Sequence, residues 1–323
     1  MTVTDAPRVR LADPAADPAA GPGGGPAAGP AAGPAADRRA RRRADREREL
    51  AAPHGWLSLA GFHWLPSRPE PLPGVPGLWL ADDAGAHLRP GETDGPRVQG
   101  PDVADGAYDG DVPEGGSVVL GTFLPAGREP VDGAAPDEPA PGVTAGAVTA
   151  GETSAVAIEL VRRTGRLAIR LRDPHARARL DFAGVPVFEH DPSWALEMPV
   201  RLYDAPQELV VGAARPGLVH RLQAVGELDL TRGDRTVTLV LTGGPGDAPT
   251  LLFSDEAPGV APWRLARPEL PGSLTPGGSG VARLDLNEAV NLPYAFSDHG
   301  TCPAPPPGNH VPFAVTAGEQ APR

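Results

Sequence analysis

The stretch AVAIELVRRTGRLAIRLR at residues 155–172 decides the fold. Two runs rich in valine, leucine and isoleucine, 155–162 and 166–172, flank Thr164-Gly165, a dipeptide that suits a tight hairpin turn. In the second run arginine or alanine alternates with leucine or isoleucine, which predicts one wet face and one buried face. The stretch therefore predicts an antiparallel β-hairpin.

Similar short runs recur along the chain, separated by glycine, proline and aspartate. They lie at 117–124, 208–213, 218–225, 227–230, 236–241, 251–255, 283–286 and 311–316. Short strands spaced about ten residues apart are typical of all-β folds. We therefore expect a mainly β fold with a short N-terminal helix, α+β at most. Its form would be an antiparallel β-sandwich or a partly closed, barrel-like sheet.

The N-terminal part of the chain has a different composition. Residues 1–36 are almost entirely alanine, proline, glycine and aspartate, which predicts a disordered tail because so few apolar groups cannot offset the entropy of ordering. Residues 37–50 carry charges of both signs and contain no glycine or proline. They are followed by a segment rich in apolar residues, HGWLSLAGFHWLP. We expect a helical segment over 37–65 at the start of a single β-rich domain, 37–323.

Charge and cysteine content exclude several classes of protein. The formal net charge is −12 and every basic side chain is an arginine, so nucleic acid is not an expected partner. One cysteine excludes an internal disulfide and a multi-thiolate metal site, and none of the eight histidines has a metal-type spacing. We expect neither metal nor cofactor. No segment approaches the roughly 18 apolar residues of a membrane span, so we expect a cytoplasmic protein with no membrane partner.

Residues 283–319 form a proline-rich segment that contains the only cysteine, Cys302. Proline lacks the N–H that helices and central strands need, so the segment must be a fixed, irregular loop. Function often lies on loops of this kind.

Four blocks of the sequence resemble the bacterial and archaeal domain-of-unknown-function family 1684, from about Trp56 onward. They are GWLSLAGFHWL, the stretch from Arg166 to Trp194, LLFSDEAPGVAPWRLARPEL, and the proline-rich segment with its TCPAPPPGN and AGE. The last block is similar to the family pattern DFN-x-A-x-NPPCAF…TCPLPPP-x-N-R-L…AGE. The resemblance implies no activity, because the family has none established.

The chain departs from the family pattern at several positions. Tyr294 stands where the family usually has a first cysteine, and His310 where it has an arginine. Trp263 replaces a tyrosine, and Leu286 a phenylalanine. A disulfide or metal site that used two cysteines is therefore excluded for this chain, and His310 would be a weaker, pH-dependent anion ligand than arginine.

Seven family-matching side chains are the candidates for ligand binding: Asp255, Arg267, Asp285, Asn287, Asn291, Cys302 and Asn309. The two carboxylates could do acid–base chemistry, or they could brace turns by accepting backbone N–H groups. We expect at least one of them to pair with Arg267. The asparagines fit turn bracing better, and Cys302 fits a buried structural thiol better than a nucleophile.

Three functions stay open. The first is a small-molecule-binding domain with a pocket between residues 253–267 and 285–309. The second is an enzyme, a hydrolase using Asp255, Asp285 and Arg267; the sequence does not decide whether the protein is an enzyme. The third is a structural or interaction module with a proline-rich clasp. Convergence of the polar residues around an open cavity would favour the first two, and burial with mutual hydrogen bonding would favour the clasp.

Overall fold

The computed structural model describes residues 34–91, 95–129, 154–244 and 247–322. It begins with helix α1 (Pro34–Leu50), whose many arginines and glutamates favour a helix. The chain divides into two units inside α1, after Arg43. All that follows concerns the second unit, Ala44–Arg323.

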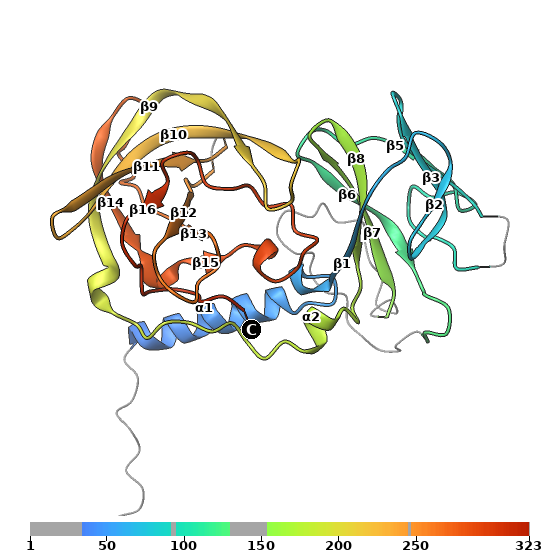
Figure 1. Cartoon of the computed structure of the whole chain (residues 1–323), viewed down its shortest axis with the longest axis horizontal. Coiled ribbons are helices and arrows are strands. Elements are labelled where there is room, and N and C mark those ends of the chain that lie inside the picture. Colours follow the sequence, from blue (N-terminus) through green and yellow to red (C-terminus); the bar gives the residue numbers. More distant parts are fainter. Residues whose placement is uncertain (1–33, 92–94, 130–153, 245–246, 323) are drawn as a thin grey trace, which may run out of the picture. The chain divides into compact units, whose positions relative to one another are not determined.

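Two antiparallel four-stranded sheets make up the first part of this unit (Figure 1). One has the order β1-β8-β7-β6, with β1 (Leu59–Trp64), β6 (Ser117–Phe123), β7 (Val156–Arg163) and β8 (Arg166–Arg172). The other has the order β2-β3-β4-β5, with β2 (Glu70–Leu72), β3 (Val75–Asp82), β4 (Gly85–Arg89) and β5 (Tyr108–Gly110).

These two sheets share one hydrophobic core. Alternate residues of the hairpin β7–β8, such as Ile158 and Ile169, are fully buried there together with Trp79 of β3 and Leu88 of β4. Because strand side chains alternate between faces, the same hairpin turns a second face away from this core. That second face carries most of the polar residues of β7 and β8.

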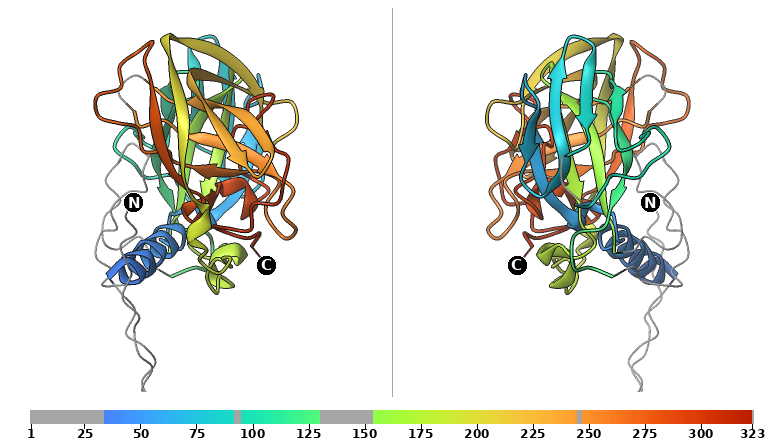
Figure 2. Two further views of the ribbon diagram at one scale, coloured as in Figure 1. Left: turned by 90° about the vertical axis from the view of Figure 1, so that its left-hand side faces the viewer. Right: turned by 90° about the vertical axis from the view of Figure 1, so that its right-hand side faces the viewer.

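Two further sheets form around a second core. One has the order β11-β10-β9-β14, with β9 (Ala195–Gly212), β10 (Val219–Arg232), β11 (Arg235–Thr242) and β14 (Ser279–Asp285). The other has the order β15-β13-β12-β16, with β12 (Leu251–Asp255), β13 (Arg264–Ala266), β15 (Val290–Asn291) and β16 (His310–Val311). Its pair β12–β16 is parallel. Leu228, Leu239 and Phe253 are fully buried in the shared core. In Figure 2 these yellow-to-red strands lie toward the viewer in the left view, and the cyan strands lie toward the viewer in the right view.

Short helices connect these elements: η1 (Trp56–Ser58), α2 (Arg177–Leu180), η2 (Pro192–Trp194), η3 (Leu286–Glu288) and η4 (Pro293–Ala295). A third, small cluster is built from connecting residues. Leu50 and Leu57 pack there with Val185, and Phe296 of the proline-rich segment packs against them.

The predicted fold class is confirmed: the protein is mostly β, with sandwich-like sheets, and none of the four sheets among the described residues closes on itself. The predicted hairpin is also confirmed. Thr164 and Gly165 have φ values of 55° and 72°, the left-handed conformations of a type I′ turn, whose twist matches that of the flanking strands.

Other predictions need correction. Residues 59–64 form strand β1 instead of the end of a helix, because Phe62 and Trp64 favour strands and the edge of β8 needs a partner. Helix α1 begins at Pro34, earlier than the predicted start at residue 37. The rest of the predicted tail lies outside the described residues.

The predicted wet face of β8 is wrong at three positions. Ala168 is fully buried, Arg170 is 4 % exposed and Arg172 is 1 % exposed. Alternation placed these arginines on one face correctly but could not reveal that other segments cover that face. Among the described residues, no helix is long and apolar enough to cross a membrane.

Candidate functional site

Asp255 ends β12 and forms an ion pair with Arg264, the first residue of β13. Arg264 Nη2 donates to Asp255 Oδ2 at 2.7 Å, and the two side chains are 0 and 2 % exposed. The other carboxylate oxygen, Oδ1, accepts from the backbone N–H groups of Ala257 and Val315 at 2.8 and 3.1 Å. Asp255 thus braces two loops, and both oxygens of its carboxylate accept hydrogen bonds.

Arg264 is held by backbone carbonyls as well as by Asp255. Its Nη1 donates to the oxygens of Ala317 and Glu319 at 2.5 and 3.1 Å, and its Nη2 donates to that of Val315 at 2.9 Å. A buried guanidinium needs such partners, because an unpaired buried charge costs several kcal/mol. The residues near the C-terminal end of the chain therefore form the binding cage of this arginine.

Arg267 does not pair with Asp255 or Asp285. It is exposed, and within the described part of the chain it makes no ion pair or side-chain hydrogen bond. The predicted pairing with Arg267 is therefore wrong: Asp255 pairs instead with Arg264, three residues earlier. In β13 position 264 points inward, whereas 267 lies beyond the end of the strand.

Asp285 and Asn287 hold a turn together. Asp285 Oδ1 accepts from the backbone N and the side-chain Nδ2 of Asn287 at 3.0 and 2.8 Å, and so caps η3. Asn287 in turn exchanges two hydrogen bonds with the backbone of Asp191, at 2.9 and 3.1 Å. This geometry joins η3 to the segment before β9.

Asn291 and Asn309 bond to backbone groups of neighbouring segments. Asn309 Nδ2 donates to the oxygens of Val240 and Leu252 at 2.9 and 2.8 Å, and its Oδ1 accepts from Val240 N at 2.8 Å. This side chain therefore links β11 to β12 as a strand would. Asn291 Nδ2 donates to Gln320 O at 2.7 Å, and Asn291 N donates to Glu319 Oε2 at 2.6 Å.

Cys302 lies behind the proline run, where its carbonyl accepts from Ala214 N at 2.9 Å. Burial raises the pKa of its thiol to about 11, although Arg170 and Arg163 nearby act in the opposite direction. The thiol is therefore protonated at neutral pH, which makes it a poor nucleophile.

Two departures from the family pattern contact each other. The rings of Tyr294 and Trp263 stack with centroids 4.0 Å apart and planes 21° apart. The Tyr294 hydroxyl accepts from Trp263 N at 2.8 Å and donates to Trp263 O at 2.7 Å. The tyrosine that stands in the place of the usual cysteine thus has a structural partner in the tryptophan that stands in the place of the usual tyrosine.

The predicted site residues do not converge on one open cavity. Asp255, Asn291 and Asn309 are braced by backbone groups, and Asp285 is occupied by Asn287. This is the arrangement expected of a clasp, which fixes the proline-rich segment on the strands beneath it. Direct ligand binding by these side chains stays a prediction.

The sequence did not reveal a group of arginines on the second face of β7 and β8, called here the arginine face. It consists of the buried Arg170 and Arg172 and the half-buried Arg163, together with the buried Glu159. Arg170 and Arg172 both donate to the fully buried Glu159, at 2.6–2.9 Å. Burial would raise the pKa of Glu159, but these two guanidinium groups lower it to about 2. Among the described residues, Arg172 Nη2 and Arg163 Nε have no hydrogen-bond partner.

A hollow in the described surface lies elsewhere, beside strands β3 and β4. It has a volume of about 350 Å³. The buried side chains of Val75, Leu88 and Val98 contribute to its lining, and the half-buried Leu78 completes the apolar part. Four prolines add rigid walls.

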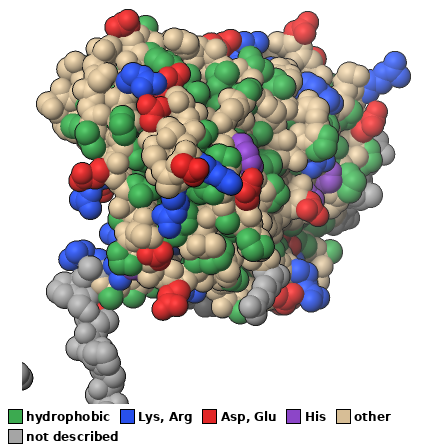
Figure 3. Space-filling view, turned by 60° about the vertical axis from the view of Figure 1, so that its left-hand side comes forward, with side chains coloured by type: hydrophobic (Ala, Val, Ile, Leu, Met, Phe, Trp, Pro, Cys, Tyr) green, Lys and Arg blue, Asp and Glu red, His purple; other side chains and the backbone are tan. Residues whose placement is uncertain are grey.

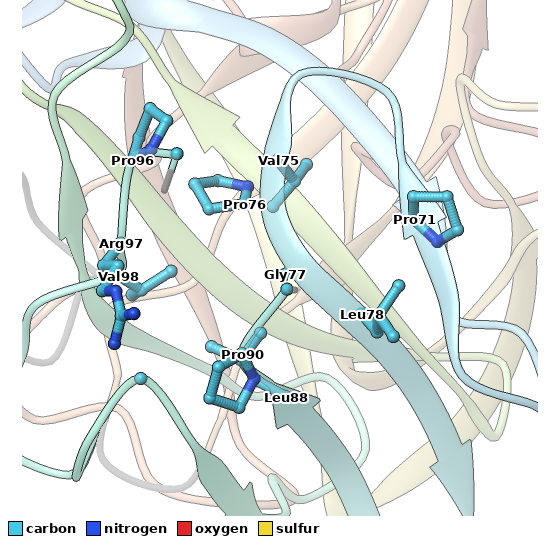
Figure 4. A pocket seen from close by; sticks show the side chains of 13 residues that line it. Pro71, Val75, Pro76, Gly77, Leu78, Leu88, Pro90, Pro96, Arg97 and Val98 are labelled. Carbon is cyan, nitrogen blue, oxygen red and sulfur yellow. The ribbon is translucent and has the colours of Figure 1, made fainter. Parts of the chain in front are cut away.

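Figure 4 shows how these residues are arranged. Pro96, Arg97 and Val98 stand on one side of the hollow, and Pro71 and Leu78 on the other. Arg97 is the one charged residue among the described residues that line it. The run PLPGVPGL at 71–78 was the sequence signal for this wall, since its prolines and glycines interrupt the strands β2 and β3.

No metal site is formed by the described residues, because no three histidine, cysteine, aspartate or glutamate side chains gather in a suitable cluster.

Comparisons with known proteins agree with the sequence blocks. Residues 180–320 match the model of the family described as "Protein of unknown function (DUF1684)", and this stretch contains β9 to β16. This match confirms the resemblance over residues 180–320.

Among solved structures, the solution NMR structure of an uncharacterized protein of Haloarcula marismortui is similar. The two chains share 27 % sequence identity, with a TM-score of 0.36, over 44 % of this chain and 78 % of the other. Among the curated proteins, none matches this chain.

Proposed function

We propose that this protein is a small-molecule-binding domain whose ligand occupies the hollow beside β3 and β4. Its volume of about 350 Å³ supports the proposal, because ligand sites typically enclose about 300–1,000 Å³. The walls are preformed: proline side chains have little freedom to lose when a ligand arrives, so ordering costs little. We also propose that the protein is cytoplasmic, as its sequence leads us to expect.

The lining favours a ligand with an apolar body and one acidic group. Apolar side chains from the core form the base of the hollow, and Arg97 supplies a positive charge. Arg97 is exposed, and within the described residues it makes no ion pair or hydrogen bond, so its guanidinium is available to a carboxylate or sulfonate.

Binding fits better than turnover. The described residues that line the hollow include no serine, cysteine, histidine, aspartate or glutamate that could act as nucleophile or general base. The carboxylates expected of a hydrolase, Asp255 and Asp285, are committed to structural hydrogen bonds. These observations support a binding domain over the hydrolase alternative.

The test uses two fluorescent probes of nearly the same shape. 8-Anilinonaphthalene-1-sulfonate carries a negative charge, and N-phenyl-1-naphthylamine carries none. We expect both to bind the native protein, and Arg97→Ala to weaken only the charged probe, by about three- to tenfold. Leu78→Trp should weaken both probes by filling the hollow.

The matched control is Leu80→Trp, which adds the same bulk two residues along β3 at a half-buried position outside the lining. It should leave both affinities unchanged. Equal loss of binding in Leu78→Trp and Leu80→Trp, or no saturable binding of either probe, would contradict the proposal.

A further inference from the structure

The walls of the hollow beside β3 and β4 consist mainly of residues that have no adjustable side chain. Of the 13 described residues that line it, four are prolines and four are glycines. A proline side chain is closed into a ring and a glycine has no side chain, so neither has rotamers to choose between when a ligand binds. The side chains therefore adapt little to the ligand, which favours a ligand that is itself rigid.

Two of the glycines bring bare backbone to the hollow. Gly77 of β3 has a φ of 81°, and a Cβ there would lie 2.5 Å from Leu88 Cδ1 and 2.7 Å from Arg89 O, so no larger residue fits. A Cβ on Gly91 would lie 4.0 Å from Gly77 Cα. The two backbones thus approach each other with no side chain between them. Bare peptide groups present a flat surface, which suits the flat face of a ring.

The four prolines are spread around the hollow. In Figure 4, Pro96 and Pro76 lie on the left, Pro90 lies below them and Pro71 lies on the right. The C–H groups of a proline ring carry a small positive charge next to the amide nitrogen, whereas the face of an aromatic ring is negative. An aromatic ring between these prolines therefore meets complementary charge from more than one direction.

Arg97 can contact both parts of an aromatic acid. Its backbone is held between the rigid Pro96 and Val98, which is 5 % exposed, and its own side chain is exposed. A guanidinium is planar, so it can stack on an aromatic ring and donate N–H groups to a carboxylate beside that ring. This double contact is possible when the acidic group is attached directly to the ring.

On the basis of the function proposed above, we propose that the ligand is an aromatic acid, a planar system of one or two fused rings with a carboxylate attached directly to it. A saturated ring of the same skeleton is puckered and has no negative face for the proline C–H groups or the guanidinium. A straight-chain acid loses the freedom of its rotatable bonds when it enters a rigid site.

Titration calorimetry with three acids tests this inference. The acids are 2-naphthoate, its saturated counterpart decahydro-2-naphthoate, and undecanoate, the straight-chain acid with the same number of carbon atoms. All three carry one carboxylate, so charge alone does not separate them. We expect 2-naphthoate to bind about tenfold tighter than either of the others.

Variants of the lining test which groups recognise the ring. Pro76→Ala and Pro96→Ala remove a proline ring, and Arg97→Lys keeps the charge but loses the planar group. Each should reduce the preference for 2-naphthoate over its saturated counterpart by about threefold. The matched control is Pro73→Ala, at an exposed proline of the same segment outside the lining, which should leave the preference unchanged. The ratio of affinities is the readout because a general disturbance of the hollow weakens both acids together.

The outcomes separate this inference from the proposed function. Equal affinities for the three acids, abolished by Leu78→Trp, would overturn the aromatic class and leave ligand binding in the hollow supported. A preference for 2-naphthoate that Pro76→Ala, Pro96→Ala and Arg97→Lys all leave unchanged would also overturn the inference. If none of the acids bound, or if Leu78→Trp left their binding unchanged, the inference and the proposed function would both be wrong.

Discussion

Arg264 and Arg267 show how differently two arginines three residues apart can be used. The first is enclosed by Asp255 and three backbone carbonyls, and the second is exposed. The sequence indicated an ion pair here but favoured Arg267, because that residue matches the family pattern. Which arginine turns inward depends on the register of β13 against β12 and β15, and that register is set by residues far apart in sequence.

Replacing Arg264 should be strongly destabilising. Arg264→Ala leaves the Asp255 carboxylate buried without its partner, so we expect the free energy of unfolding to fall by about 3–5 kcal/mol. Arg267→Ala removes the same side chain at an exposed position and should change it by less than about 0.5 kcal/mol. Urea denaturation measures both. A small effect of Arg264→Ala would show that the pair adds little to stability.

At the scale of elements, strand β8 shows where sequence reasoning succeeds and where it stops. Its alternation identified the strand, the turn before it and the buried positions Leu167 and Ile169. It could not show that Trp56 lies over the other face, with its ring 4.7 Å from the Arg172 guanidinium carbon. The cover over a strand comes from distant segments, so a local pattern does not reveal it.

The strands β3, β4 and β5 carry a pH-sensitive group. His87 of β4 faces Asp109 of β5 and Asp82 of β3, and its Nε2 lies 2.8 Å from Asp82 Oδ1. Hydrogen bonds to Asp109 and then to Asp82 raise the pKa of His87 above 6.5. Both carboxylates have a lowered pKa, mainly through hydrogen bonds: Asp82 to His87, and Asp109 to Arg89 and His87.

This group should stabilise the protein in acid more than in base. A raised histidine pKa means that the folded state holds the proton more tightly, so the contribution is complete below pH 6.5 and fades as pH rises through the folded value. His87→Gln should therefore cost more stability at about pH 5.5 than at about pH 8. Chemical denaturation of the wild-type protein and the variant at the two pH values measures this difference in cost. An equal cost at both would contradict a charged His87.

At the scale of the whole chain, the sequence predicted the β-rich class and the family but not the division into two cores. Leu160 and Leu239 have similar surroundings in sequence, yet one is buried with β3 and β4 and the other with β12. Which sheets face each other follows from long-range packing.

The surface seen in Figure 3 has acidic and basic side chains interspersed, so the negative charge is not concentrated in one patch on that face.

Residues 318–323 should be essential to the fold. Glu319 Oε2 accepts from Asn291 N at 2.6 Å, its Oε1 accepts from Arg46 Nε at 3.3 Å, and its carbonyl is part of the Arg264 cage. Deleting 318–323 removes these partners together, so we expect a loss of about 3–5 kcal/mol of unfolding free energy. Thermal and urea denaturation measure it.

The comparison is deletion of residues 1–33, whose composition predicts no stable contact with the domain and hence an unchanged melting temperature. If the six-residue deletion proved as harmless as the longer one, the structural role given to the Arg264 cage would be wrong.

The Arg264 cage also bears on how the chain folds while it is being made. Its acceptors at Val315, Ala317 and Glu319 are synthesised 51, 53 and 55 residues after Arg264. At ordinary translation rates that delay is on the order of 3–10 s. During this interval β12 and β13 can pair, but their central guanidinium lacks its carbonyl partners. The second core therefore stays incomplete on the ribosome, and a slowed ribosome prolongs the time in which its apolar strands are open to aggregation or to a chaperone.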